Sequence, residues 1–340
     1  MRVDSRVVVA MDKFRSSASA TQLAQVIVRE ISGDSVVDVV ALSDGGEGFR
    51  AAFSGEEYVV RVRDPWGEWH DAPVSVVHGS AESVAIIEVA EVIGRAIRRN
   101  PTSREALVAS SAGVADAIWA AGELGVQRVL IGCGGSATSD GGEGCFEELG
   151  ARGSLDLALS AATDIKAPYF AALAYAEQKG VASDDLGGVR ERLERLAAHF
   201  ELVTGHDVRD VARTGAAGGL GGALYALGAD LVSGFDEVAR ATSLAQRVRG
   251  AAAVITGEGR LDWGSLDGKV VSGVCATTSP QQRVLVICGS CDVDAAAALV
   301  GRHPWVQVVD LVSRYGERRA WNDTLECVAE SAARFLTESG

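Results

Sequence analysis

Two acidic, glycine-rich segments of the chain carry residue types that suit phosphate or metal binding. Residues 44–48 and residues 140–144 both read Asp-Gly-Gly-Glu-Gly, and each lies downstream of an apolar run typical of a buried strand. Glycine permits positive φ and close backbone approach, so amides exposed in such a turn can hold phosphate oxygens. The carboxylates can bind a metal ion or accept a proton. Because the pattern occurs twice, we favour a functional interpretation over two unrelated turns.

The second of these segments sits in the stretch that suits phosphate best, residues 129–149. Val-Leu-Ile at residues 129–131 predicts a strand, and residues 146–149 predict the first part of a helix. Between them lie six glycines, three hydroxyl side chains and the acids Asp140 and Glu143. Amides at such a strand-to-helix turn can bind an anion. A tight turn without a ligand is the alternative interpretation of the same residues.

Other strand-like runs also end in polar residues. Residues 7–10 and residues 253–255 are short and rich in β-branched side chains, which predicts buried strands. Open parallel sheets bind ligands at the carboxyl ends of their strands, where the following loops meet. We therefore expect the polar residues after these runs to contribute to one site. They are Asp12, Arg15, Gly257, Glu258, Asp262 and Lys269.

Strands and helices must alternate to bring these loops together. Apolar runs predict further strands at residues 36–42, 59–62, 74–77, 84–89, 284–288 and 306–312. Apolar periodicity predicts helices after Ser19, over residues 113–124, over 169–179 and around 189–200. Such alternation is typical of α/β proteins.

Composition limits the classes of function. The chain has 340 residues with 47% hydrophobic side chains, which predicts one large domain or two medium ones. Its net charge of −14 argues against nucleic acid or a membrane surface as a partner. The charged first six residues are unlike a signal peptide, and no uncharged stretch is long enough to span a membrane. We expect a cytoplasmic protein.

Several segments together resemble the bacterial type I glycerate kinase family, and the resemblance covers nearly the whole chain. They are residues 11–20, 43–48, 134–142, 215–222 and 256–262 with Gly268-Lys269. The resemblance implies an α/β fold of two domains with a ligand cleft between them. A Rossmann-like parallel-sheet domain would comprise residues 1–60 and 240–340, and a second α/β domain, residues 61–239, would be inserted into it.

The resemblance also implies an activity and the groups that it needs. The chain would be an ATP- and Mg²⁺-dependent kinase that phosphorylates a hydroxyl of glycerate, as a glycerate 2-kinase does, or of a closely related hydroxy acid. The sequence leaves open whether the chain forms a homodimer. Phosphoryl transfer asks a protein mainly to position the reactants and to neutralise charge.

These requirements suggest a role for each candidate residue. Gly134, Gly135, Ser136 and Thr138 would cradle phosphate, and Gly257 with Glu258 would also contact the nucleotide. The candidate Mg²⁺ ligands are Asp44, Asp140 and Glu258. Lys269 would counter the phosphate charge, Arg15 would bind the substrate carboxylate, and either Asp262 or Asp12 would orient the attacking hydroxyl.

Three segments depart from the family pattern. Lys13 and Arg15 replace the serine and lysine of the usual Asp-Ser-Phe-Lys-Gly-Ser loop, and arginine can bind a carboxylate bidentately. Residues 110–115 lose a hydroxyl and a glycine of the usual Thr-Ser-x-Gly-Thr-Gly stretch. The family's Asp-Val-Thr-Asn-Pro-Leu loop survives only as Asp-Ile-Lys-Ala-Pro at residues 164–168, and the segment after it is several residues short. These changes predict a substrate preference different from plain glycerate.

Two other functions fit parts of the sequence. A dinucleotide-dependent oxidoreductase would also use glycine-rich strand ends. It is disfavoured because no Gly-x-Gly-x-x-Gly follows the first strand with an acid about twenty residues on. A degenerate family member that binds the metabolite without catalysis is the second alternative, because of the altered loop at Asp164.

Overall fold

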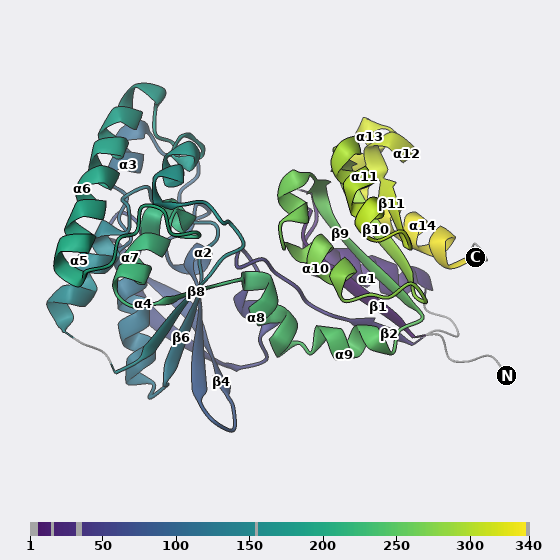
Figure 1. Ribbon diagram of the computed structural model, residues 1–340, viewed down its shortest axis with the longest axis horizontal. Coiled ribbons are helices and arrows are strands. Elements are labelled where there is room, and N and C mark those ends of the chain that lie inside the picture. Colours follow the sequence, from purple (N-terminus) through teal and green to yellow (C-terminus); the bar gives the residue numbers. More distant parts are fainter. Residues whose placement is uncertain (1–5, 15–16, 32–35, 154–155, 338–340) are drawn as a thin grey trace. The chain divides into compact units, whose positions relative to one another are not determined.

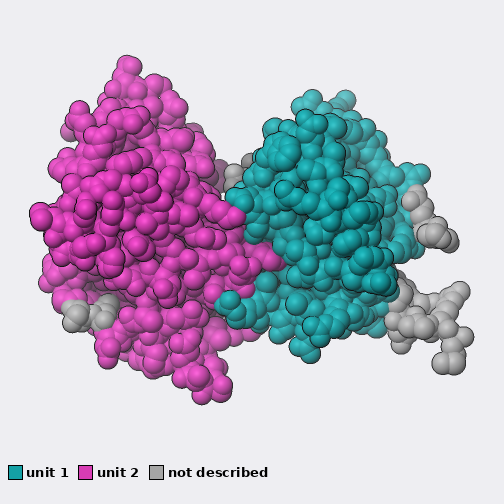
Figure 2. Space-filling model, viewed as in Figure 1, with its two compact units in different colours: residues 1–43, 238–340 teal, residues 44–237 magenta. Residues whose placement is uncertain are grey.

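The computed structural model describes residues 6–14, 17–31, 36–153 and 156–337. The chain divides into two compact units, which are coloured separately in Figure 2 and described here one at a time. Unit 1 comprises Met1–Ser43 and Val238–Gly340, and unit 2 comprises Asp44–Glu237. The sequence prediction put the first boundary at residue 60 and the second at residue 240. The cleft expected between the domains stays a prediction.

Unit 1 is built on a five-stranded parallel sheet with the strand order β11-β10-β9-β1-β2 (Figure 1). Its strands are β1 (Val7–Met11), β2 (Val37–Val39), β9 (Ala253–Leu261), β10 (Arg283–Cys291) and β11 (Val306–Asp310). From β1 the chain first adds β2 on one side and later adds β9 on the other. The sheet is therefore doubly wound, and its switch point lies between β1 and β9.

Helices cover both faces of this sheet. On one face α1 (Ala20–Ile31) and α14 (Thr324–Thr337) lie side by side and share a hydrophobic core with β1, β9 and β10. On the other face α10 (Val270–Ala276) contacts β9 and β1. β1 is buried on both faces, as its unbroken apolar sequence predicts. The remaining helices of this unit are α9 (Leu244–Arg249), α11 (Val293–Arg302), α12 (Leu311–Tyr315) and α13 (Glu317–Asn322).

Unit 2 contains a six-stranded mixed sheet whose strands follow one another in chain order, β3 to β8 (Figure 1). β3 (Glu56–Arg63), β4 (Trp69–His78) and β5 (Ser83–Glu88) pair antiparallel. β6 (Arg128–Gly132), β7 (Ala158–Ala162) and β8 (Asp230–Val232) continue from β5 in parallel. The parallel part is wound in one direction only, so this sheet has no switch point like that of unit 1.

The helices of unit 2 form two hydrophobic cores. α2 (Val89–Val92), α4 (Ala112–Glu123), α5 (Glu143–Arg152) and α7 (Leu220–Ala226) pack against the sheet. α6 (Leu186–Thr204) covers a second core around Tyr169 and Phe200. The other helices are α3 (Ser103–Val108) and α8 (Gly234–Ala241), which crosses the boundary to unit 1. The short 3₁₀ helices of unit 2 are η1 (Arg50–Ala52), η2 (Tyr169–Tyr175), η3 (Glu177–Lys179), η4 (Ser183–Asp185) and η5 (Ala216–Gly219), and η6 (Trp263–Leu266) belongs to unit 1.

The α/β fold class and most of the expected elements are confirmed, with two local differences. The strand expected at residues 36–42 is only Val37–Val39, because the chain leaves the sheet edge after three residues. The helix expected over residues 169–179 is a pair of 3₁₀ helices, in which Tyr169 is fully buried. Among the residues that the structure describes, no helix is long and apolar enough to cross a membrane.

Candidate functional site

The polar residues after β1 and β9 lie together at the switch point of unit 1. Met11 pairs with Gly257 in the parallel register, and the Asp12 amide donates to the Gly257 carbonyl over 2.9 Å. Asp12 therefore follows the end of β1, and Glu258 lies beside it in the carboxyl-terminal half of β9, the side of a doubly wound sheet at which ligands bind. Gly257 is confined there, because a Cβ atom would lie 2.0 Å from the Ile287 carbonyl oxygen.

Glu258 is the acid of this cluster with the most unusual surroundings. Its Oε1 atom is buried and has no hydrogen-bond partner. Burial raises the pKa of Glu258 to about 8; Ser265 and Lys269 oppose the shift, whereas Asp12 and Asp262 add to it. Buried polar atoms in folded proteins normally have a partner, so this oxygen is a candidate ligand-binding atom.

Asp262 and Lys269 flank the same cluster. Asp262 caps η6 through a capping box, in which its Oδ1 atom accepts from the Ser265 amide over 3.3 Å. A Cβ atom at Gly264 would lie 3.1 Å from Asp262 Oδ1 and 3.8 Å from Lys269 Nζ, so both side chains lie beside Gly264. Unit 1 thus gathers three acids and a cation around one strand end.

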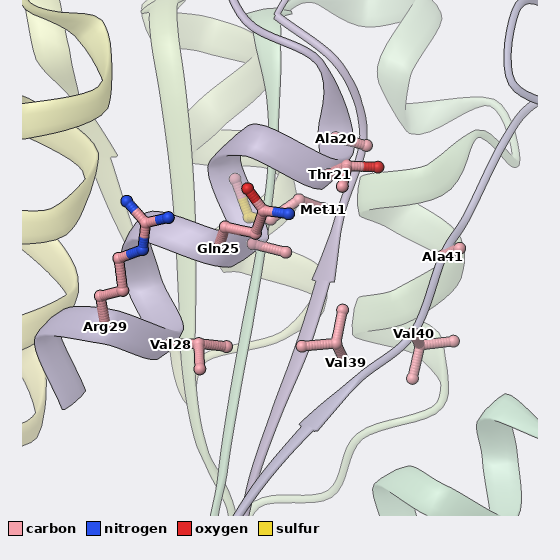
Figure 3. A pocket seen from close by; sticks show the side chains of 10 residues that line it. Met11, Ala20, Thr21, Gln25, Val28, Arg29, Val39, Val40 and Ala41 are labelled. Carbon is pink, nitrogen blue, oxygen red and sulfur yellow. The ribbon is translucent and has the colours of Figure 1, made fainter. Parts of the chain in front are cut away.

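A separate apolar cavity of about 470 Å³ lies between α1 and β2 (Figure 3). Val28 and Val39 face it from opposite sides, and Thr21 and Gln25 add polar atoms along α1. Met11 lines it and directly precedes Asp12 in the chain. None of the residues that the sequence analysis selected as site residues lines this cavity.

In unit 2 the first Asp-Gly-Gly loop lies against the ends of β6 and β7. The Gly134 amide donates to the Gly45 carbonyl over 2.9 Å. A Cβ atom on Gly134 would lie 2.2 Å from the Gly46 Cα atom, and one on Gly45 would lie 2.6 Å from the Ala162 carbonyl oxygen. These glycines therefore allow two loops distant in sequence to touch at one edge of the sheet.

Asp140, the first residue of the second Asp-Gly-Gly loop, is 4% exposed and hydrogen-bonded on both oxygens. Its Oδ2 atom accepts from the amide and hydroxyl of Ser111, each over 2.7 Å, and from the Gly144 amide over 3.2 Å. Its Oδ1 atom accepts from the Gly142 amide over 3.2 Å. These bonds tie the loop to the start of α4 and α5, which is an internal role for a residue expected to bind Mg²⁺.

The Asp164 carboxylate, in the altered loop, also accepts hydrogen bonds from its own unit. It accepts from the Ser233 hydroxyl over 2.7 Å and from the Phe235 amide over 3.0 Å, at the start of α8. Burial raises the pKa of Asp164 to about 6, and the Asp44 carboxylate adds to the shift. Asp44 itself accepts from the Gly46 amide over 3.3 Å.

Some residues of these loops could not be selected from the sequence. Lys179 is 9% exposed, and its Nζ atom donates to the Ser136 hydroxyl and to the Thr138 carbonyl. Ser111 binds Asp140, and the Glu88 carboxylate accepts from the amides of Gly48 and Arg50. Ser111 lies in a stretch that resembles a family motif, but the sequence does not show that it binds Asp140, because each of these residues depends on a partner distant in the sequence.

The structure brings the expected residues together in two groups. Asp12, Gly257, Glu258, Asp262 and Lys269 belong to unit 1, whereas Asp44, Gly134, Gly135, Ser136, Thr138 and Asp140 belong to unit 2. Arg15 lies outside the described residues. In the part of the chain that the structure describes, no group of three or more His, Cys, Asp or Glu side chains could hold a metal ion unaided. Mg²⁺ does not require such a cage, because it usually keeps waters and phosphate oxygens as ligands.

The fold and these loops define an α/β protein with ligand-binding features at the carboxyl ends of its parallel strands. Comparison with known proteins identifies the family: the glycerate kinase family model matches residues 7–158 and 154–337. The chain belongs to the glycerate kinase family, which confirms the resemblance seen in the sequence, and it is therefore a kinase-family enzyme.

Individual relatives agree with this assignment. The chain is 34% identical to glycerate 2-kinase of Escherichia coli over 328 residues, which cover 84% of this chain and 85% of the relative. It is 36% identical over 310 residues to an uncharacterized protein of Mycobacterium bovis, covering 86% and 81% of the two chains. Its fold is similar to the crystal structure of a protein assigned as glycerate kinase 2 from Salmonella typhimurium LT2. That match has a TM-score of 0.73 at 30% identity and covers 97% of this chain and 96% of the other.

Proposed function

We propose that this chain transfers a phosphoryl group from ATP to a hydroxyl of glycerate or of a closely related hydroxy acid. The observation that carries the proposal is the unpartnered Glu258 oxygen at the switch point of unit 1, beside Asp12 and Lys269. A kinase needs hard oxygen ligands for a metal and positive charge near the phosphates. Family membership supplies the class of reaction, and this cluster supplies groups that suit it.

Mg²⁺ fits the acids of unit 1 by their chemistry. A buried carboxylate oxygen with no internal partner is an open oxygen donor, and Mg²⁺ is commonly bound through one or two carboxylates plus substrate phosphates. We propose Glu258 and Asp12 as the carboxylates that would hold it; the role of Asp44 in metal binding stays a prediction from the sequence. When bound there, Mg²⁺ would supply positive charge that offsets the negative charge of the phosphates. Asp140 is a weaker candidate, since its four hydrogen bonds already use both oxygens.

The other groups would bind, orient and neutralise. Lys269 beside Asp262 would place a positive charge near the transferred phosphate, where such charge is most effective. Asp12 or Asp262 would accept a hydrogen bond from the attacking hydroxyl and orient it. Arg15 would bind the carboxylate of the hydroxy acid in a bidentate manner. In unit 2, the loop with Gly134, Gly135, Ser136 and Thr138 would contact the anionic part of a substrate through its amides.

The altered Asp164 loop bears on which acid is preferred. Because Asp164 caps α8 through Ser233 and Phe235, its carboxylate is committed to that helix, and the residues after it are fewer than in the family pattern. A site that pairs a substrate hydroxyl rejects analogues strongly, so losing such a partner relaxes or shifts the preference. We therefore propose that acids longer than glycerate and carrying extra hydroxyls are also accepted.

Acid-dependent ATP turnover by the purified chain tests this function. The assay compares D-glycerate with longer polyhydroxy acids, with and without Mg²⁺, and identifies the phosphorylated product by mass spectrometry. We expect turnover that requires both Mg²⁺ and an acid. Hydrolysis of ATP without an acid, or no turnover with any acid, would contradict the proposal. A strong preference for D-glycerate alone would retain the kinase but remove the proposed effect of the Asp164 loop.

A further inference from the structure

Lys179 is a buried cation beneath the loop of residues 134–142. It ends the 3₁₀ helix η3, and its Nζ atom donates to Ser136 Oγ over 2.9 Å and to the Thr138 carbonyl over 2.6 Å. Burial lowers the pKa of Lys179 to about 7; the Asp140 carboxylate opposes the shift and Arg95 adds to it. Lysine is almost never buried without a compensating partner, because removing its charge from water is costly. Both of its described partners belong to one loop.

The same loop contains two buried hydroxyl groups with no hydrogen-bond partner. Thr138 is 0% exposed and Ser139 is 5% exposed, yet neither Thr138 Oγ1 nor Ser139 Oγ has a partner. Unsatisfied buried hydroxyls are rare in folded proteins and call for a specific explanation, such as a bound group. Two adjacent ones beside a buried cation indicate a loop built to receive further hydrogen-bond partners of negative charge.

A second glycine-rich segment closes around this cation. The Gly141 amide donates to the Gly218 carbonyl over 3.0 Å. Gly218 has φ of +74°, and a Cβ atom there would lie 2.1 Å from the Thr138 carbonyl oxygen and 2.9 Å from Lys179 Nζ. Any larger residue would disrupt the bond between Lys179 and Thr138. The glycines of residues 215–222 thus pack closely against the loop and leave room for the lysine.

We propose that Lys179 is a positioning residue of the phosphoryl-transfer reaction. Its ammonium holds the loop of residues 134–142 through Ser136 and the Thr138 carbonyl, and it supplies the positive charge that favours an anionic group of a substrate at that loop. The inference rests on the proposed function, in which this loop contacts substrate. The anion is either a phosphate of ATP or the carboxylate of the hydroxy acid, and separate measurements for the two substrates distinguish these sources.

The test compares Lys179→Met, Ser136→Ala and the double variant in the full chain. Methionine has a similar volume and removes the cost of burying a charge, although Ser136 Oγ and the Thr138 carbonyl then lose their donor. We expect Lys179→Met to fold and to lower kcat/KM by roughly 10- to 100-fold, the range for losing charge-assisted hydrogen bonds. If the KM for ATP rises in the variant, the anion at the loop is a phosphate of ATP. If the KM for the acid rises, the anion is the carboxylate of the acid.

Two comparisons separate this role from a purely structural one. Arg209→Met removes one positive charge from a partly exposed ion pair with Glu201 and should leave both KM values unchanged. The double variant should lose no more than Lys179→Met alone, because Lys179 acts in part through Ser136. Unchanged KM and kcat values in Lys179→Met, or losses that multiply in the double variant, would overturn the proposal.

A binding measurement keeps the inference separate from the proposed function. Inorganic phosphate, ADP and D-glycerate are each tested for thermal protection of the wild type and of the Lys179→Met variant. We expect at least one of these anions to protect the wild type and to protect the variant less. If no acid supports turnover but this difference is found, the proposed function fails and the anion-binding role of Lys179 stands. Equal protection of the two proteins would overturn the inference whether or not the chain is active.

Discussion

The two units contain acids with the same sequence signature and opposite surroundings. Glu258 lies in the glycine-rich carboxyl-terminal half of strand β9 in unit 1, and Asp140 lies in the glycine-rich loop after strand β6 in unit 2. Asp140 accepts four hydrogen bonds from its own unit, whereas one oxygen of Glu258 has none. An acid whose oxygens are all used stabilises a loop, and an acid with an open buried oxygen can bind a ligand. We infer that Glu258, and not Asp140, is the metal-binding acid.

The topology of the two sheets agrees with this division. Unit 1 has a switch point between β1 and β9; Asp12 follows β1, and Glu258 lies in the carboxyl-terminal half of β9. Unit 2 adds its parallel strands in one direction, and its loops are held by internal bonds from Ser111, Glu88 and Lys179. In the proposed function, the doubly wound unit would therefore supply the groups that bind metal and nucleotide, while the second unit would supply a preformed loop.

The largest effect that we expect is on turnover in Glu258→Gln. The amide keeps the size of the side chain but removes the negative charge that would hold Mg²⁺ near the phosphates. We predict that kcat falls by roughly 100- to 1000-fold, as for loss of one electrostatic group in an active site. Thermal stability should be unchanged or higher, because a buried unpaired carboxyl is removed. Glu326→Gln, a change at an exposed position of α14, is the matched control and should retain wild-type kcat.

Asp140→Asn should show the reverse pattern, with an effect mainly on stability. The new amide group would meet N–H and O–H donors where an oxygen accepted them, and each lost buried bond costs about 1–3 kcal/mol. We predict a Tm lowered by roughly 4–10 °C, with the folded protein retaining more activity than Glu258→Gln. Thermal melts and kcat measured well below the Tm test this. A stable Asp140→Asn with a kcat as low as that of Glu258→Gln would make Asp140 a ligand after all.

A smaller effect concerns pH, measured without Mg²⁺ or nucleotide. The pKa of Glu258 rises on folding from its ordinary 4.5 to about 8, so its folded-state contribution to stability is present below pH 4.5 and is lost as the pH rises to 8. The pKa of Lys179 falls on folding from 10.5 to about 7, so its contribution is present above pH 10.5 and is lost as the pH falls to 7.

The variants should separate these opposite slopes. As the pH rises from 5 to 8, the Tm of Glu258→Gln should rise relative to that of the wild type. As the pH rises from 7 to 10, the Tm of Lys179→Met should fall relative to that of the wild type. We expect Tm differences of a few degrees, from melts at constant ionic strength. Parallel pH curves for the wild type and Glu258→Gln would show that Glu258 titrates normally.

The sequence predicts the fold well where apolar runs are long and the loops after them are rich in glycine. β1, β6, β9 and α4 lie close to where such runs predict them. The 3₁₀ helices at residues 169–179 were less predictable. They bury Tyr169, whose hydroxyl donates to the Gly141 carbonyl, where a regular helix was expected. Local propensity does not contain such a tertiary contact.

The candidate site was predictable in its loops but not in the role of each acid. Asp140 and Glu258 look alike in sequence, but two of the four donors that satisfy Asp140 belong to Ser111, which lies 29 residues earlier in the chain. Lys179 was missed for the same reason, because its partners Ser136 and Thr138 lie more than forty residues earlier. Hydrogen-bond partners distant in the chain decide which acid is open and which lysine is buried.

Titration of Mg²⁺ in the turnover assay, with the wild type, Glu258→Gln and Asp140→Asn side by side, tests the division between the two acids most directly. The turnover rates of all three proteins are measured at saturating ATP and acid, at a temperature below the Tm of every variant. We predict that Glu258→Gln needs at least ~10-fold more Mg²⁺ for half its maximal rate, as expected when a metal-binding group is lost. Asp140→Asn should keep the wild-type Mg²⁺ midpoint. A midpoint shifted in Asp140→Asn and unchanged in Glu258→Gln would contradict the assignment of metal binding to unit 1.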